Sequence, residues 1–143
     1  MHRGGLTIAE LLVTIMIVAL VAALGMPRLG RTMDWMAAEA ATRDVSTALA
    51  VARATAAMQG IRTRVVIAAD SLRLDRWEPA QWVPLRRWPG PLSRGVSVDV
   101  SNPEVVFGPT GLTWGVSNTK VVLRRGTQVE VLTVSSVGRV KRW

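Results

Sequence analysis

A long apolar segment near the amino terminus constrains the fold of this chain more than any other feature. The segment runs from Leu6 to Met26, and its only interruptions are Thr7, Glu10, Thr14 and Gly25. As an α-helix it would be about 31 Å long, close to the hydrocarbon thickness of a bilayer. We therefore expect this segment to span a membrane.

The composition limits the classes of protein to consider. With 143 residues the chain is long enough for one ordinary domain, and its apolar residues, 49% of the total, concentrate in the amino-terminal segment. Cysteine is absent, which excludes disulfides, thiolate nucleophiles and Cys-ligated metals. The formal charge of +8 lies beyond the span, because Arg3 and Glu10 cancel, and it favours anionic partners such as nucleic acid, lipid head groups or acidic proteins.

A cleaved secretory signal is one alternative for the apolar segment. Residues 1–5 form a short basic leader, and Val21-Ala22-Ala23 has the small side chains of a signal cleavage region. An acidic residue as early as Glu10 is unusual in such a signal. Arg28 and Arg31 follow the span, whereas Arg3 precedes it. A simple positive-inside count therefore favours the orientation in which the residues after the span, and not the leader, lie in the cytoplasm. An envelope protein that is anchored by its signal and never polymerises therefore stays an alternative.

Helical periodicity continues after the apolar segment. Pro27 has no N–H to donate and should kink the helix where the apolar run ends. Residues 28–60 then predict an amphipathic helix with Gly60 as its stop. One face carries Ala37, Ala41, Val45, Ala48, Leu49, Ala52 and Ala56, and the opposite face carries Glu39, Arg43, Ser46 and Arg53.

The periodicity changes to that of strands after Gly60, and residues 61–143 predict a β-sheet domain. Ile61 to Ile67 and Leu72 to Trp77 form a hairpin around Asp70-Ser71, whereas the proline-rich stretch Glu78 to Gly95 is a loop or a broken edge strand. Further strands are expected at Val96–Val100, Val105–Phe107, Lys120–Arg125 and Gln128–Val134. A helix packed on one face of an antiparallel sheet, an α+β fold, buries both apolar surfaces.

The amino-terminal motif resembles a known signal. Arg3-Gly4-Gly5-Leu6-Thr7-Ile8-Ala9-Glu10, the apolar run and Pro27 resemble the class III signal of type IV prepilins and type II secretion pseudopilins. Leu6 stands where Phe or Met is commoner in that family. The resemblance implies that a prepilin peptidase cuts between Gly5 and Leu6 and methylates the new amine of Leu6. It also implies that Glu10 and Pro27 serve assembly.

The chemistry of Glu10 suits that role. A carboxylate at the bilayer centre costs about 2.5–3.5 kcal/mol, so it should be retained only where it finds a partner. The free amine of Leu6 on a neighbouring subunit would neutralise it and fix the stagger between subunits. Thr7-Ile8-Ala9-Glu10 also fits a capping box, in which Thr7 and Glu10 satisfy free amides at the helix start. Both roles stay open.

The carboxy-terminal half resembles a narrower family, the H-type pseudopilins and FimT minor pilins. The resemblance rests on Phe107-Gly108-Pro109-Thr110-Gly111, on Lys120-Val121-Val122-Leu123 and on Val131 to Val140. It implies a minor pseudopilin of a type II secretion pseudopilus, held in the bacterial inner membrane with its sheet domain in the periplasm. The implied partners are other pilin or pseudopilin subunits, the prepilin peptidase, and a secreted protein or DNA.

The basic tail gives the alternative function. Gly138-Arg139-Val140-Lys141-Arg142-Trp143 resembles the Gly-Arg-x-Arg tail implicated in DNA binding by FimT-like minor pilins, with Lys141 in place of the last Arg. Lysine still contacts phosphate but lacks the bidentate fork of arginine. Arg124 and Arg125 could extend the patch, and Trp143 could stack on a base. The alternative for these charges is a solvated strand edge that discourages aggregation.

The remaining side chains predict no enzyme, metal or cofactor. His2 is the only histidine and lies in the leader, which excludes His-based chemistry after cleavage. The turn Gly108-Pro109-Thr110-Gly111 lacks the lysine of a phosphate-binding loop. Trp77, Trp82 and Trp88 lie in or beside the proline-rich stretch and could form an aromatic binding surface, although packing or a subunit contact is the commoner role.

Overall fold

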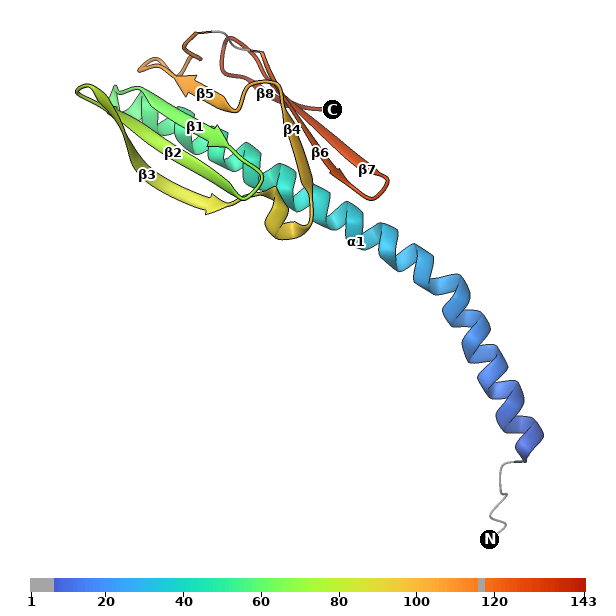
Figure 1. Ribbon diagram of the computed structural model, residues 1–143. Coiled ribbons are helices and arrows are strands. Elements are labelled where there is room, and N and C mark those ends of the chain that lie inside the picture. Colours follow the sequence, from blue (N-terminus) through green and yellow to red (C-terminus); the bar gives the residue numbers. More distant parts are fainter. Residues whose placement is uncertain (1–6, 116–117) are drawn as a thin grey trace. The chain divides into compact units, whose positions relative to one another are not determined.

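The computed structural model describes residues 7–115 and 118–143 and divides into two compact units, Met1–Met33 and Asp34–Trp143. One helix, α1 (Ile8–Gln59), contributes residues to both units (Figure 1). The secondary structure stays helical through Pro27. The kink expected at that residue stays a prediction.

Within the second unit α1 buries the face that the sequence predicted. Ala41, Val45, Ala48, Leu49, Ala52 and Ala56 are at most 1% exposed, and Ala38 is buried beside the half-buried Ala37. The helix ends as predicted at Gly60, whose φ of 65° is left-handed, and the N–H of Ile61 donates to the carbonyl of Ala56 at 3.2 Å. The face that the sequence predicts to be apolar is therefore the face that is buried.

The first antiparallel sheet has the strand order β3-β2-β1-β5. Its strands are β1 (Thr63–Ile67), β2 (Ser71–Glu78), β3 (Gln81–Pro89) and β5 (Glu104–Phe107). β1 and β2 form the predicted hairpin, with Val65 opposite Leu74. Alternate residues of β1 are buried, so one face of this sheet contributes to the core.

The second antiparallel sheet has the order β4-β6-β7-β8. Its strands are β4 (Ser97–Val100), β6 (Thr119–Arg125), β7 (Gln128–Val134) and β8 (Val140–Arg142), and a 3-10 turn, η1 (Pro91–Arg94), precedes β4. The sequence predicted β4, β6 and β7, and Gly126-Thr127 forms the turn between the last two. It did not predict β8, which is made from the basic tail.

The proline-rich stretch is an edge strand rather than a loop. Among the described strands β3 pairs only with β2, and the register shifts between Leu74 and Asp75, whose partners are Arg86 and Pro84. Proline has no N–H for a second neighbour, so an edge is where a sheet tolerates it. Of the two alternatives that the sequence left open, a loop and a broken edge strand, the structure shows the edge strand.

The core of the second unit joins the helix to both sheets. The buried residues of α1 belong to one hydrophobic cluster with Val65 and Leu74 of the first sheet and Leu123 and Leu132 of the second. Phe107, at the end of β5, is completely buried among them. The expected α+β class is confirmed, with the strands divided between two sheets.

Candidate functional site

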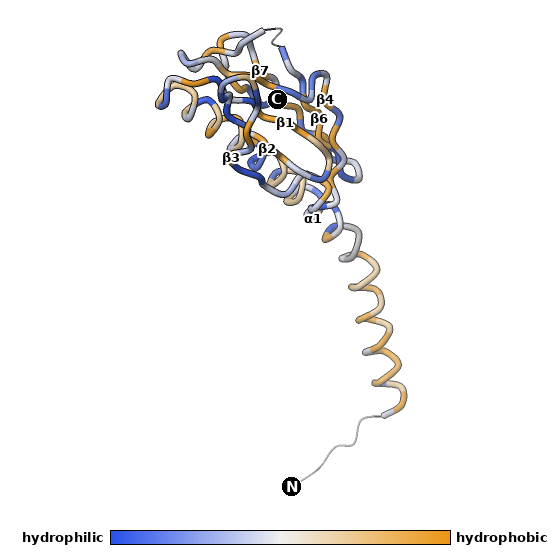
Figure 2. Tube along the Cα trace, turned by 60° about the vertical axis from the view of Figure 1, so that its left-hand side comes forward, coloured by the Kyte–Doolittle hydropathy of each residue, from blue (hydrophilic) through white to orange (hydrophobic). Residues whose placement is uncertain are grey.

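The first unit exposes a continuous apolar helix. The large apolar side chains that the structure describes between Ile8 and Met33 are 51–81% exposed, and the described residues contain one helix long and apolar enough to cross a membrane. Figure 2 shows the hydrophobic colouring along this part of α1. A surface of this kind needs a bilayer or other helices to cover it.

The start of α1 bears on the two roles considered for Glu10, which are helix capping and pairing with the Leu6 amine of a neighbouring subunit. Thr7 Oγ1 accepts a hydrogen bond from the main-chain N–H of Glu10 at 3.2 Å, which is the threonine half of a capping box. The Glu10 carboxylate itself has no hydrogen-bond or ion-pair partner among the described residues. The cap therefore uses the backbone of residue 10 and not its carboxylate. Gly5 and Leu6, the predicted cleavage and methylation positions, lie outside the described residues.

Strand pairing divides the predicted basic tail between two faces. β8 pairs with β7, with Leu132 opposite Arg142 and Thr133 opposite Lys141. Because successive side chains of a strand point to opposite faces, Arg142 lies on the side of the buried Leu132 and Lys141 on the other. Trp143 lies on the same face as Lys141. Its Nε1 donates to Thr133 Oγ1 at 3.2 Å, and Lys141 Nζ lies 3.5 Å from the centre of its ring.

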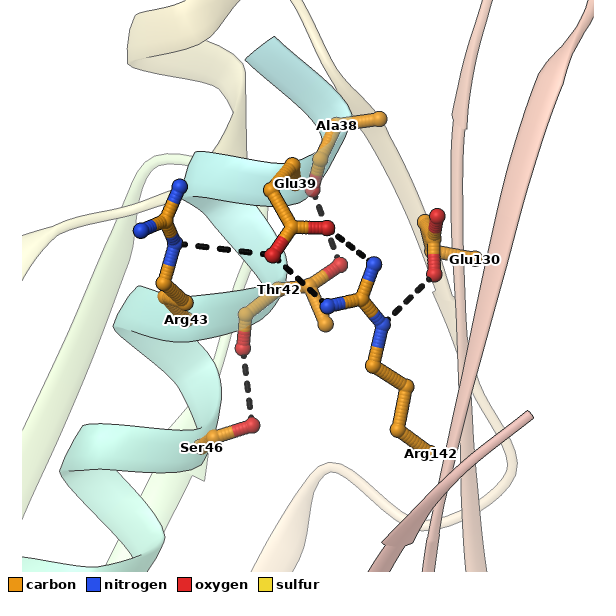
Figure 3. A network of polar contacts seen from close by, with 7 residues as sticks. All are labelled: Ala38, Glu39, Thr42, Arg43, Ser46, Glu130 and Arg142. Carbon is orange, nitrogen blue, oxygen red and sulfur yellow. Dashed lines mark hydrogen bonds and ion pairs between the residues drawn. The ribbon is translucent and has the colours of Figure 1, made fainter. Parts of the chain in front are cut away.

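Arg142 is an internal clamp between the tail and the helix (Figure 3). Its Nη1 donates to Glu39 Oε1 at 2.7 Å, its Nη2 donates to Glu39 Oε2, and its Nε donates to Glu130 Oε2 at 2.9 Å. Arg43 adds a longer ion pair to Glu39, at 3.6 Å. The hydrogen bonds that Arg142 donates to the carboxylates of Glu39 and Glu130 raise the pKa of Arg142. This guanidinium is occupied within the fold.

Arg125 is similarly engaged. Its Nε lies 2.8 Å from Asp34 Oδ1, and its Nη1 donates to the main-chain oxygen of Arg94. Arg94 in turn pairs with Asp44 at 2.8 Å. Acidic residues of α1 thus hold three arginines from η1, β6 and β8.

Several basic side chains of the second sheet lie on its outer face, away from the acidic residues of α1. The register places Arg124 opposite Val129 and Lys120 opposite Thr133, so both lie on the face of Lys141. The side chains of Arg124, Arg139 and Lys120 meet no carboxylate in the part of the chain that the structure describes. Lys120 was not predicted on this face, although its spacing of four residues from Arg124 within one strand places both side chains on the same side.

Gly138, which opens the tail motif, has a structural role. Its φ is 71°, and a Cβ on it would lie 2.8 Å from the main-chain oxygen of Gly111. Its own carbonyl accepts a hydrogen bond from Arg53 Nη1 at 3.2 Å. The predicted turn at residues 108–111 and the tail turn are therefore packed against each other beside α1.

The tryptophans pack beside arginines and one another. Trp77 and Trp82 are edge-to-face at 5.0 Å, and Arg64 lies 4.7 Å above the ring of Trp82. Arg62 lies 4.0 Å above Trp114, which is 55% exposed. Among the described residues no three His, Cys, Asp or Glu side chains are grouped as metal ligands.

The clamp predicts a pH dependence of stability. Hydrogen bonds from Arg142 hold the pKa of the Glu39 carboxyl below its usual range. Such a carboxyl stabilises the fold above its unfolded pKa of about 4.3, and that contribution is lost as the pH falls through the folded pKa. We expect the free energy of unfolding to fall more steeply below about pH 4.3 in the native chain than in Glu39→Gln. Urea unfolding across the acid range measures this, and equal pH slopes would contradict it.

Comparisons with known proteins agree with the α+β fold described above. The family model described as type II transport protein GspH matches residues 41–138. The type IV minor pilin FimU of Pseudomonas aeruginosa PAO1 is similar in fold. Its P65 crystal structure gives a TM-score of 0.62 at 15% identity, over 73% of this chain and 91% of FimU. Its P21 crystal structure gives 0.60 at 17% identity, over 78% and 88%.

At these identities the likeness to FimU shows the fold alone, and no curated protein sequence matches the chain. The family match is different in extent, because it covers more than half of the chain and nearly all of the compact second unit. The chain therefore belongs to the GspH family of type II transport proteins.

Proposed function

We propose that this chain is a minor pseudopilin, a structural subunit of a type II secretion pseudopilus assembled from the bacterial inner membrane. The observation that carries the proposal is the exposed apolar segment of α1, which is continuous in sequence with a GspH-type domain. The membrane holds the subunit through α1 until a filament of other subunits replaces it as the cover of the apolar side chains. The sheet domain then lies in the periplasm.

The proposed assembly step uses the amino terminus. A prepilin peptidase cleaves between Gly5 and Leu6 and methylates the Leu6 amine. The Glu10 carboxylate, which has no partner in the described part of the chain, then pairs with the Leu6 amine of the neighbouring subunit. This pair neutralises two charges in an apolar environment and sets the axial position of each subunit.

Mass spectrometry of the mature protein from its membrane tests the processing step. The expected amino terminus is a methylated Leu6. An amino terminus at Met1 would contradict cleavage, and one near Gly25 would show removal of the span as a secretory signal. Either result would leave Glu10 without its proposed partner.

DNA binding is a second candidate function, favoured by the outer face of the second sheet. Arg124, Lys120 and Lys141 share this face with Trp143, which is 68% exposed. Cations that track phosphates beside an aromatic ring that stacks on bases are the arrangement used for single strands. In this proposal Arg125 and Arg142 contribute to the fold instead.

Replacing Arg124 and Lys141 together by alanine tests the second candidate. We expect weaker binding of single-stranded DNA, with the salt dependence reduced by about 0.7 per lost phosphate contact. The matched control is Arg86→Ala with Arg87→Ala, which removes the same charge from exposed positions of β3. An equal loss in both double variants would show a general charge effect and contradict a site on this face.

A further inference from the structure

Among the strands that the structure describes, β8 is an open edge of the second sheet. β8 is last in the order β4-β6-β7-β8. Ser135 N–H donates to Arg139 O, and Trp143 N–H donates to Val131 O, both at 3.0 Å. In an antiparallel pair, hydrogen-bonded residues alternate along the strand. The odd-numbered residues therefore face β7, and the main-chain groups of Val140 and Arg142 point away from it.

No described part of the chain satisfies those outward groups. Neither the N–H nor the C=O of Val140 or Arg142 has a hydrogen-bond partner across the open edge among the described residues. The edge strand β3 of the first sheet is different, because Pro84 and the register shift make its exposed edge unsuitable for pairing with another strand. β8 thus offers two donors and two acceptors in strand geometry.

A groove of about 550 Å³ runs beside this edge, between α1 and the second sheet. Ala50, Ala54 and Ala57 form the helix wall, and Leu132 and Val140 lie across from them. All three alanines are exposed, although their side chains are apolar. The groove therefore has room for the side chains of an added strand, and its walls favour apolar ones.

The charge of the lining points to the chemistry of the occupant. The groove is lined by two arginines, Arg53 and Arg142, and by no acidic residue. Arg142 is neutralised by Glu39 and Glu130, whereas Arg53 donates, within the described part of the chain, only to the neutral carbonyl of Gly138. An occupant that carries a carboxylate near Arg53 would complement this remaining charge.

We infer that the groove binds an extended, apolar segment bearing one carboxylate, contributed by a neighbouring subunit of the filament and added to β8 as a fifth strand. Main-chain hydrogen bonds to Val140 and Arg142 hold the segment, and the alanine wall accommodates its side chains. This inference rests on the proposed function, because it takes a subunit of the same filament as the partner.

The first test measures exchange of main-chain amide hydrogens in the full chain, in detergent and in isolated filaments. In detergent, the Val140 and Arg142 amides should exchange faster than those of Lys141 and Trp143, which face β7. In filaments, the exchange of Val140 and Arg142 should slow by about tenfold or more, since both become hydrogen-bonded. Unchanged fast exchange of these two amides in filaments would overturn the inference.

The second test uses substitutions that leave the bonds between β7 and β8 intact. Val140→Pro removes one outward N–H, and its incorporation into filaments should fall about fivefold, whereas Val140→Thr should incorporate normally. Ala54→Phe, which fills the groove, should also reduce incorporation, and Thr47→Phe on the same helix outside the groove should not. Arg53→Gln keeps a donor for Gly138 and should lower incorporation by loss of charge alone.

The outcomes separate this inference from the proposed function. Absence of the native chain from filaments overturns both. Incorporation of the native chain together with normal incorporation of Val140→Pro overturns strand addition alone. Loss with Ala54→Phe but not with Val140→Pro would assign the groove to a helix and would likewise overturn it. Thermal unfolding of each variant shows that the domain is folded, so that a loss reports on assembly.

Discussion

Replacing Glu10 by valine should reduce incorporation into filaments by about a hundredfold or more while leaving the chain in the membrane. Removing one partner of a desolvated ion pair costs about 3–5 kcal/mol, because the other charge is left buried and unpaired. Insertion should persist, since the substitution removes the only acidic residue of the apolar span. Immunoblots of sheared filaments and of washed membranes measure the two quantities.

Thr7→Val is the control that separates pairing from capping. Thr7 Oγ1 caps the helix through the main-chain N–H of Glu10, and valine at position 10 retains that N–H. Loss of the cap costs about 1 kcal/mol and leaves the carboxylate in place. If pairing governs assembly, Thr7→Val should enter filaments at nearly the native level. Normal incorporation of Glu10→Val would instead contradict the pairing with Leu6.

Local periodicity explains which elements could be predicted from the sequence. The buried face of α1 and the strands β1, β2, β6 and β7 follow from repeats of 3.6 and 2 residues, which are set by neighbouring side chains. The edge position of β3 is favoured by another local feature, because Pro84 has no N–H to donate to a second neighbouring strand. The division into two sheets does not, because antiparallel strands of similar pattern can pair with several partners.

The basic tail shows why the candidate site was only partly predictable. The sequence identifies the charges of Arg139, Lys141 and Arg142 but not which are free. Glu39, the partner that occupies Arg142, lies 103 residues away in the sequence, and Asp34 lies 91 residues from Arg125. Only the fold brings these side chains together. The same pleat that turns Arg142 toward the helix turns Lys141 toward the solvent.

Gly138→Ala should destabilise the second unit by about 2–4 kcal/mol. A left-handed conformation costs a residue with a Cβ about 1–2 kcal/mol. Overpacking adds a similar amount, because the new Cβ would lie 2.8 Å from the main-chain oxygen of Gly111 and 3.5 Å from the Phe107 ring. Thermal or urea unfolding of the full chain in detergent measures the loss.

Gly60→Ala is the matched control for that loss. Gly60 has a φ of 65°, close to that of Gly138, but a Cβ on it would meet no atom within 4 Å. This variant should therefore show only the conformational cost, about 1–2 kcal/mol. Equal losses in both would contradict the close packing of the tail turn on Gly111. Because Gly138 supports the fold, failure of a Gly138 variant in secretion or DNA binding reports a loss of stability. Arg139→Ala instead tests the exposed charge of the next residue.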